Sequence, residues 1–541
     1  MLNSSCRKAP LQENIYSPTS SLQDTTNTIL GKKLENPYTL QNMRKAYTAI
    51  TTSNNTKYKI LNVDNPVRLT HKYIRFLPKD TLEYDRLVRD TILKLYNTPL
   101  DYEIAIQGNY YHDPTVKYNL YTWLYASVPE GHALLPDIQH QFLDSLYIPE
   151  EDPLLNTTSN TVANTKTTFS DNDLAGSRQM LINNLLNQAM TQTHNYEYIN
   201  NTNNKLKTLS YNPQGNITTY DTLLKKLVPL QGVRIRMKRW FTTRIVETDA
   251  NGNYKSATTF SGPVNYYLFF ETSRFDIRTG WFGQASINGP KQTDPWNVTI
   301  WPDDINRFYA DVFRGAYRYW YGDIGGLYRP TLVTAIKYAA RDNNTNTSTH
   351  GVATPSLSVF GVFPQIYISR RLNGRITDSD ENFTTTVHET AHYTHYRNML
   401  KNFKLMNSMI RESWATAVEL YITKKEYQAK GITNYGEPVY FDVSTDFFPT
   451  YRGYQLFQVT SSVSYTPLFI DLVDNNNQFQ SIGSGNNGAL KDNITGYNMP
   501  ALESYLALVE NQNDLRFFLK NHKPVGVTDV QLDDFLSQFK F

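Results

Sequence analysis

The amino-acid sequence predicts a multidomain α+β protein. At about 150 residues per domain, the 541 residues are too many for one hydrophobic core. Closely spaced strand and turn patterns fill residues 229–271, whereas helical spacing dominates after about residue 290. With 40% hydrophobic and 13% aromatic residues, the chain can bury large cores, which excludes global disorder. We therefore expect a mixed N-terminal region, a small β-sandwich and a mainly helical C-terminal domain.

The composition excludes several classes of partner and site. With 53 basic and 50 acidic residues, the net charge of +3 is too small to indicate nucleic acid as a partner. The sequence contains no run of 18 apolar residues, so we expect no membrane-spanning helix. The single cysteine excludes an internal disulfide framework and a thiolate zinc site.

Residues 1–35 are polar and predict a disordered tail. The tail contains Cys6, with small residues directly before it and a polar stretch after it, and no signal peptide precedes it. This arrangement resembles the mature start of a bacterial lipoprotein. It implies an exported protein, at the cell surface or in the periplasm, attached to a membrane through lipidated Cys6. The alternative is a free cysteine in a disordered tail.

Residues 36–225 predict a mixed α/β region. Residues 72–77 have the composition of a short strand, and residues 85–96 and 175–192 have helical spacing. Between them, residues 151–172 lose their apolar periodicity and fill with Asn, Thr and Ser, which indicates a loop or insertion.

Residues 226–290 predict the small β-sandwich. Residues 229–237 alternate apolar and polar side chains, residues 248–254 form a tight turn, and residues 266–271 form a further strand. The pattern P-L-x-G-V, T-D-x-x-G-x-Y, G and Y-x-x-x-x-E resembles the transthyretin-like, carboxypeptidase-regulatory type of β-sandwich. Modules of this type pack against other parts of a protein or bind a partner. The resemblance therefore implies no catalytic residues within residues 226–290.

Residues 291–541 predict the mainly helical domain. Residues 304–321 show a helical apolar face, and residues 331–340 fit either a strand or a helix. Residues 365–369 are expected to form an edge strand just before the main helix, able to pair with an extended peptide.

The key motif is His-Glu-x-x-His, formed by His388, Glu389 and His392. On a helix, residues four apart differ by about 40° in direction and about 6 Å in rise, so both histidines can bind one ion. Glu389 is rotated by about 100° and can reach a water on that ion without binding the metal. Asp378, Ser379 or Asp380 can cap this helix, with Glu381 in its first turn.

A third metal ligand is expected at Glu412, twenty residues after His392, on a second helix that Asn407 or Ser408 could cap. Two helices joined by a short loop run antiparallel, which lets Glu412 face the histidine pair. Two histidines and one glutamate leave a tetrahedral position open for water, as in catalytic zinc sites. We therefore expect one catalytic Zn²⁺.

The set His388, Glu389, His392 and Glu412 resembles the gluzincin metallopeptidases, the thermolysin-like group. The sequence E-S-W-A-x-x-V-E that begins at Glu412 is similar to uncharacterised bacterial lipoprotein-type members. The resemblance implies a zincin-type fold and peptide-bond hydrolysis, with Glu389 as the general base of a zinc-bound water. One departure is Thr416, because the thermolysin branch has an aspartate there that orients a zinc histidine; Glu419 could replace it.

The oxyanion-stabilising residue is the least determined part of the site. The resemblance implies a Tyr or His downstream, and Tyr497 is favoured because a glycine-bearing turn could present it to the cleft. The other candidates are Tyr454, Tyr465 and His522.

Three alternatives stay open. His395 lies one turn beyond His392 and could be mistaken for a ligand, although the position and the lack of a glycine turn argue against it. The protein could be a non-catalytic surface binding protein with a vestigial zinc site, or a zinc hydrolase of non-peptide amides. The main prediction is a zinc metallopeptidase that acts on peptides or proteins.

Overall fold

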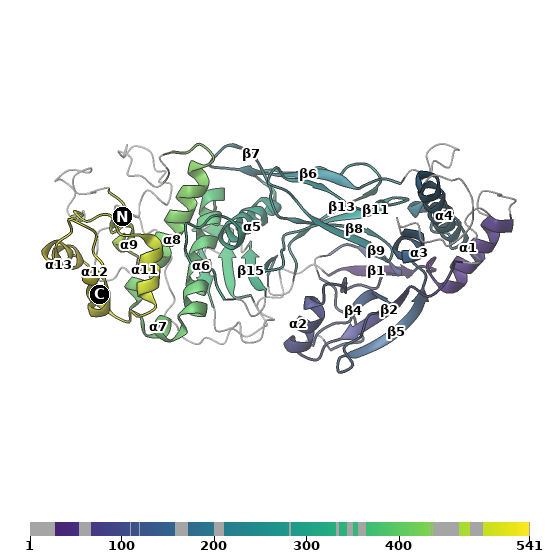
Figure 1. The fold of residues 1–541 in the computed structure, drawn as a ribbon, viewed down its shortest axis with the longest axis horizontal. Helices are drawn as coiled ribbons and strands as arrows, with labels where there is room; N and C mark the ends of the chain where they lie inside the picture. Colours follow the sequence, from purple (N-terminus) through teal and green to yellow (C-terminus); the bar gives the residue numbers. More distant parts are fainter. Residues whose placement is uncertain are drawn as a thin grey trace.

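The computed structural model shows a mixed α+β protein that is elongated in outline (Figure 1). It describes residues 27–52, 66–108, 110–117, 120–156, 171–199, 210–280, 283–331, 335–342, 350–354, 364–433, 435, 465–475 and 491–539. Within these ranges, no helix is both long and apolar enough to cross a membrane. Cys6 and Tyr454 lie outside the described residues.

The N-terminal module is built on a sheet in which β2 (His71–Leu77) lies between β4 (Leu124–Pro129) and β5 (Gln139–Leu146). Beside this sheet, α1 (Leu40–Thr52) packs against α4 (Asp171–Gln192). Short helical segments connect these elements: α3 (Pro153–Asn156) and two 3-10 turns, Pro149–Glu151 and Tyr196–Tyr198.

Two sequence predictions for this module are wrong. Residues 29–33, expected in the disordered tail, form β1 (Ile29–Lys33), which pairs antiparallel with β3 (Tyr102–Ile106). The helix expected over residues 85–96 is α2 (Thr81–Arg89) and ends seven residues early. Its expected last residue, Tyr96, instead exchanges backbone hydrogen bonds with Tyr125 at 2.7 and 2.9 Å. A non-local pairing thus overrides the local helical pattern.

The central module contains two antiparallel-rich sheets. In the first, β6 (Gln214–Asp221) pairs with β7 (Lys226–Pro229), β10 (Asn253–Lys255) and β14 (Val298–Ile300). The second has the order β13 (Ser286–Gln292), β11 (Val264–Phe269), β8 (Arg234–Arg239) and β9 (Thr242–Glu247). Buried side chains of both sheets share one core. These strands extend beyond both ends of the predicted range 226–290.

The third module begins within that range. Its sheet has the order β12 (Phe275–Arg278), β15 (Ile336–Arg341), β17 (Ile366–Ser369) and β16 (Gly351–Ala353). The first three strands run parallel, and β16 is antiparallel at the edge. The prediction that residues 365–369 form the edge strand is therefore wrong, because β17 is paired on both sides. Among the described strands, β12 and β16 lie at the two edges of this sheet, and β16 is the edge next to β17.

Helices complete this module (Figure 1). The long helices α5 (Ile305–Tyr321) and α8 (Ser408–Gln428) both pack against α6 (Ser379–Asn398), and α7 (Leu400–Leu405) joins α6 to α8. Shorter elements are the hairpin β18 (Arg371–Leu372) and β19 (Arg375–Ile376), and α9 (Leu468–Asp471). The last helices are α11 (Met499–Leu506), α12 (Gln512–Asn521) and α13 (Asp529–Leu536), at the end opposite the N-terminal module.

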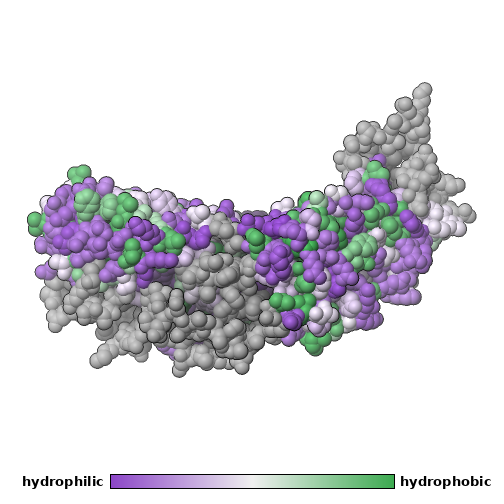
Figure 2. Space-filling view, turned by 90° about the horizontal axis from the view of Figure 1, so that it is seen from below, coloured by the Kyte–Doolittle hydropathy of each residue, from purple (hydrophilic) through white to green (hydrophobic). Residues whose placement is uncertain are grey.

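The surface is mixed in character. On the face shown in Figure 2, hydrophobic residues are interspersed with hydrophilic ones at both ends of the molecule. Exposed apolar side chains of the C-terminal helices and their loops include Leu508, Phe517, Val525 and Val530. Trp414 lies in the core, where its ring packs edge-on against that of Phe469, with the ring centroids 5.4 Å apart.

Candidate metal centre

The helix that bears the motif, α6, is more deeply buried than its sequence suggests. It begins with a capping box between Asp378 and Glu381, one of the expected caps. All its residues from Ser379 to His395 are buried, not only the apolar stripe formed by residues 383, 387 and 391. The buried threonines of this helix keep hydrogen-bond partners, because hydroxyls such as that of Thr390 donate to the carbonyl four residues earlier, at 2.6 Å.

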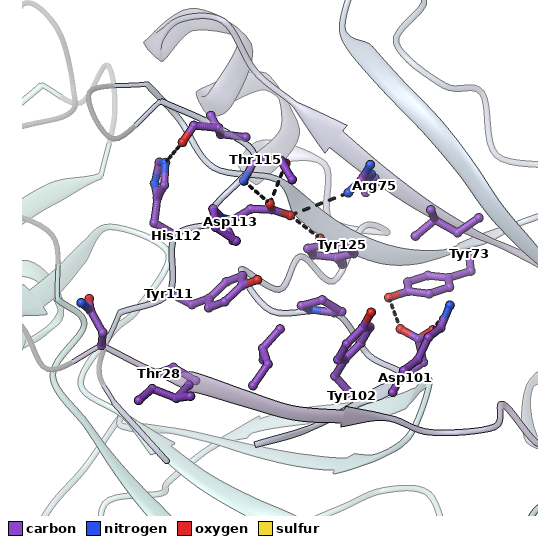
Figure 3. Close-up of a pocket in the computed structure, with 18 of the residues that line it drawn as sticks. Thr28, Tyr73, Arg75, Asp101, Tyr102, Tyr111, His112, Asp113, Thr115 and Tyr125 are labelled. Atoms are coloured by element: carbon purple, nitrogen blue, oxygen red, sulfur yellow. Dashed lines mark hydrogen bonds and ion pairs between the residues drawn. The ribbon is translucent and has the colours of Figure 1, made fainter. Parts of the chain in front are cut away.

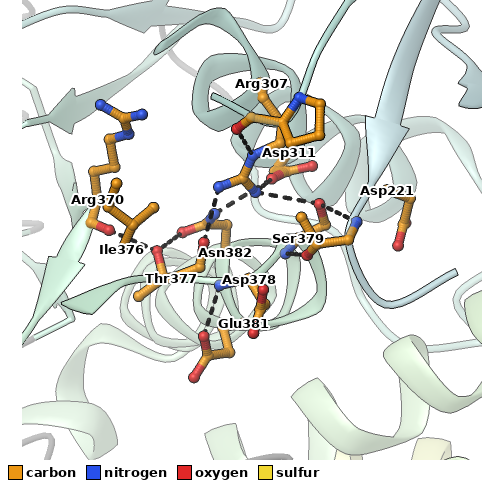
Figure 4. A network of polar contacts seen from close by, with 12 residues as sticks. Asp221, Arg307, Asp311, Arg370, Ile376, Thr377, Asp378, Ser379, Glu381 and Asn382 are labelled. Carbon is orange, nitrogen blue, oxygen red and sulfur yellow. Dashed lines mark hydrogen bonds and ion pairs between the residues drawn. The ribbon is translucent and has the colours of Figure 1, made fainter. Parts of the chain in front are cut away.

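A buried polar network fixes the start of α6 against α5 (Figure 4). The Arg307 guanidinium donates to Asp311 at 2.8 Å and to the Thr377 carbonyl at 3.0 Å. Asn382 of α6 donates to the same Asp311 carboxylate at 3.3 Å. Burial raises the pKa of Asp311 to about 6, against the opposing charges of the two arginines beside it. The network holds α6 in one rotation about its axis, which determines where the motif points.

The three expected metal ligands meet at one point. The His392 Nε2 atom lies 2.9 Å from Glu412 Oε2 and 3.0 Å from His388 Nε2, and His388 Nε2 lies 3.6 Å from Glu412 Oε2. All three side chains are buried. The residues come from α6 and α8, which lie side by side as the helical pattern predicted.

These distances fit a tetrahedral zinc site. Ligand atoms about 2.05 Å from a zinc ion at tetrahedral angles are about 3.3 Å apart. The three observed separations, 2.9, 3.0 and 3.6 Å, bracket that value. Three protein ligands of type His, His and Glu are the set that leaves a fourth position open.

A second carboxylate orients His388. Its Nδ1 atom lies 2.9 Å from Glu419 Oε2, on α8. Because a carboxylate accepts hydrogen bonds, Nδ1 carries the proton and Nε2 keeps its lone pair for a metal. The substitute orienting residue expected at Glu419 is thus in place. Thr416, which stands where thermolysin-like enzymes have aspartate, is buried, and its hydroxyl has no hydrogen-bond partner among the described residues.

The electrostatics of the site favour a cation. Burial disfavours a charged His388, but Glu419 and Glu412 outweigh this effect and raise its pKa well above the usual value. Burial lowers the pKa of His392. Three carboxylates, including that of Glu389, surround two imidazoles, and a divalent ion would compensate this excess of negative charge.

The general-base candidate Glu389 lies against the edge strand β16. The backbone N–H of Ala353 donates a hydrogen bond to its carboxylate. Gly351 leaves the room for this approach, because a Cβ atom there would lie 2.6 Å from Glu389 Oε1. Burial, together with the charges of Glu412 and Glu419, raises the pKa of Glu389 to about 7, in the range suited to a base near neutral pH.

The residue before β16 ties this strand to α6. His350 is buried, and its Nε2 donates to Asn382 Oδ1 at 3.3 Å, while the Thr385 hydroxyl donates to its Nδ1 at 2.7 Å. Burial lowers the pKa of His350, so the neutral ring makes both contacts. Thr385 precedes Glu389 by one helical turn. The edge strand and the candidate base therefore share one rigid support.

Among the downstream candidates for the oxyanion-stabilising residue, Tyr465 lies beside the cluster. The ring of Tyr465 lies 5.9 Å from the ring of His388. Its neighbour Thr466 is anchored by two hydrogen bonds to Ser413, at 2.7 and 3.1 Å, directly after the ligand Glu412. The geometry thus favours Tyr465.

The favoured candidate Tyr497 is not brought to the site. Its side chain is buried in the core of the C-terminal helices, and its hydroxyl donates to the Leu519 carbonyl at 2.7 Å. The side chain of His522 stacks on Tyr505 at 4.6 Å in the same helical region. Neither residue contacts the three ligands, so the choice of Tyr497 finds no support in this geometry.

His395 is not a member of the ligand cluster. Among the described residues neither of its ring nitrogens has a hydrogen-bond partner, and its ring packs edge-on against Phe403 at 5.4 Å. Burial lowers its pKa to about 3, so the ring is neutral at physiological pH. This is the environment of a packing residue.

A scan against protein-family models finds no family that matches the chain, and a search of curated proteins finds no match. Sequence reasoning missed His350, Gly351 and Ala353, which support Glu389. They follow a polar stretch of the sequence, and only the pairing of β16 with β17 reveals their role.

Proposed function

We propose that this protein is a zinc-dependent metallopeptidase of gluzincin type, which hydrolyses peptide bonds with Glu389 as general base. The observation that carries the proposal is the convergence of His388, His392 and Glu412 within tetrahedral ligand distances, beside a buried carboxylate that does not belong to the ligand set. A structural zinc site would use four protein ligands.

Each residue has a definable task. When bound, zinc supplies a Lewis acid that lowers the pKa of water and polarises the scissile carbonyl. The Glu389 carboxylate accepts a proton from the attacking water and donates it to the leaving amine. The N–H of Ala353 orients the Glu389 carboxylate. Burial raises the pKa of this carboxylate to about 7. Glu419 holds His388 in the tautomer that can bind the metal.

The substrate would bind along β16. One side of this strand pairs with β17, and its other side is the edge of the sheet next to Glu389. An extended peptide can add to such an edge through backbone hydrogen bonds, which places a peptide bond near the base without selecting a particular side chain. The hydroxyl of Tyr465, whose ring lies 5.9 Å from that of His388, would stabilise the oxyanion.

The proposed location is the cell envelope. The motif resembles bacterial lipoprotein-type zincins, and the small residues before Cys6 resemble a lipidation site. Labelling with a lipid precursor, compared between wild type and Cys6→Ser, tests this part of the proposal. Equal labelling of the two proteins would contradict it.

The central experiment measures metal content and cleavage together. Wild type and Glu389→Gln are analysed for zinc by mass spectrometry and incubated with a peptide library. We expect about one zinc per chain in both proteins, and cleavage only by wild type. Zinc-loaded wild type that cuts no peptide would refute the peptidase proposal and favour a non-peptide amide substrate or a binding protein.

The ligand set has its own test. Glu412→Ala is expected to lose zinc, because it removes one of three protein ligands. His395→Ala serves as the matched control, since it removes a buried histidine nearby that is not in the cluster. Loss of zinc from His395→Ala, or its retention by Glu412→Ala, would overturn the assignment.

A further inference from the structure

A cavity lies in the N-terminal module (Figure 3). The strands of this module are at the end of the molecule opposite the last helices (Figure 1). Its volume is about 970 Å³, within the usual range for ligand sites. The lining residues all fall between positions 27 and 144, from β1, β2, β3, β4 and β5 and the segment 111–116. The cavity therefore shares no residue with the candidate metal centre.

The walls of the cavity are held by hydrogen bonds (Figure 3). The Asp113 carboxylate accepts from the Thr115 hydroxyl at 2.6 Å and from the Tyr125 hydroxyl at 3.0 Å. On the other side, the Tyr73 hydroxyl donates to Asp101 at 3.1 Å and accepts from the Leu100 N–H at 2.8 Å. Such a site is formed before a ligand arrives, which lowers the entropic cost of binding.

Two further tyrosines point into the cavity. Tyr111 is 8% exposed, and its hydroxyl has no hydrogen-bond partner among the described residues. Figure 3 shows the rings of Tyr111 and Tyr102 directed towards the space between the two walls. Burial, with the nearby charge of Asp113, raises the pKa of Tyr111 to about 12, so its hydroxyl stays protonated. A tyrosine hydroxyl that faces a cavity can donate or accept a hydrogen bond, which favours a polar ligand.

The charge of the lining indicates the sign of that ligand. Three aspartates, at positions 101, 113 and 144, face one lysine and one arginine, which leaves a net charge of −1. Lys33 lies 3.5 Å from Asp101, and Arg75 lies 3.7 Å from Asp113 while stacking on a tryptophan ring.

The remaining carboxylate, Asp144, forms no ion pair within the described part of the chain. Its Oδ1 atom accepts only the N–H of the next residue, at 2.8 Å. Burial and the charge of Asp101 raise its pKa, although the N–H of Ser145 and the charge of Lys33 act in the opposite direction.

We propose that this cavity is a second binding site that takes a cationic ligand group, the ammonium or guanidinium of a basic side chain. Asp144 would compensate its charge, the hydroxyl of Tyr111 would accept a hydrogen bond from it, and the tyrosine rings would pack against its alkyl stem and attract the cation. The proposal is independent of the metal centre.

The test compares a cation with its neutral isostere. Binding of n-butylguanidinium and of n-butylurea to the full-length wild-type chain is measured by saturation-transfer NMR. We expect the guanidinium to bind at least about tenfold more tightly. Asp144→Asn should weaken its binding about tenfold, and Tyr111→Phe less strongly. Asp534→Asn, an exposed carboxylate on α13, is the matched control and should change nothing.

The outcomes separate the alternatives. Equal binding of the urea and the guanidinium, or unchanged binding by Asp144→Asn, would overturn the proposal. Binding of a neutral oligosaccharide in place of the cation would show that the tyrosines serve a sugar. Zinc content, measured on the same samples, should be the same in all variants, so a failure here is distinct from a failure of the proposed peptidase.

Discussion

Replacing Gly351 by alanine places a methyl group against the proposed general base. The added Cβ would lie 2.6 Å from Glu389 Oε1, 2.8 Å from Glu389 Cγ and 2.5 Å from Thr385 Cγ2. Ordinary van der Waals contact begins at 3.4 Å, so the carboxylate or the strand must move by about 0.8 Å (3.4 − 2.6). The hydrogen bond from Ala353 cannot keep its geometry during that movement.

The expected consequence is a loss of turnover with little loss of metal. A misplacement of about 1 Å in a reacting group can cost about 100-fold in rate, so we expect kcat to fall by about 10- to 100-fold. Zinc content should remain at the wild-type level, because the hypothetical Cβ approaches none of the three ligands. The assay combines kcat for a cleaved peptide, zinc per chain by mass spectrometry and thermal unfolding.

A glycine elsewhere provides the control. At Gly131, in the N-terminal module, a Cβ would meet no heavy atom within 4 Å, so Gly131→Ala should leave kcat unchanged. Wild-type kcat in zinc-loaded, folded Gly351→Ala would refute the placement of Glu389 against β16. Simultaneous loss of zinc and activity would show instead that the substitution disrupts the whole site.

Three further predictions concern the surroundings of the site. Glu419→Gln removes the charged acceptor of His388 and should weaken zinc binding by about 10- to 100-fold, measured by competition with a chelating indicator; unchanged affinity would exclude the orienting role. Tyr465→Phe should lower kcat by about 100-fold or more with zinc content unchanged, and wild-type kcat would remove Tyr465 from the mechanism. Burial raises the pKa of Asp380 to about 8, so the folded state holds a proton that the unfolded state has lost above about pH 4. Stability should therefore fall by up to about 1.4 kcal/mol per pH unit as the pH rises from about 4 to 8; urea unfolding of Asp380→Asn should show this slope reduced, and an identical slope would contradict the assignment.

The convergence of His388, His392 and Glu412 could be predicted because it depends on helix geometry. Spacing of four residues puts His388 and His392 on one face of α6, and a short connection brings α8 alongside. The capping box at Asp378 is equally local. The position of Glu419, seven residues after Glu412, follows from the same geometry, since two helical turns return to the same face.

The predictions that failed concern pairings between distant segments. Residues 365–369 do form a strand, but whether a strand lies at the edge of a sheet depends on what else pairs with it, and here β16 adds outside β17. β12 belongs to the sheet of the third module although it lies within the predicted range of the second. Strand patterns predict that a segment is extended and one face is buried, but they contain no information about its neighbours.

The choice of the oxyanion-stabilising tyrosine likewise depends on contacts between segments that are distant in the sequence. With 39 tyrosines in the chain, spacing and turn residues cannot identify the one that would stabilise the oxyanion. The glycine turn beside Tyr497 favoured this residue, but its hydroxyl bonds to Leu519 instead. Tyr465 is brought near His388 because Thr466 bonds to Ser413, the residue after Glu412, across 53 positions of sequence. The hydroxyls that form this bond are among the most common side-chain donors, so their pairing has no sequence signature. A side chain that lies beside the cluster of His388, His392 and Glu412 is therefore found from the bonds that anchor its neighbour, and those bonds exist only in the folded chain.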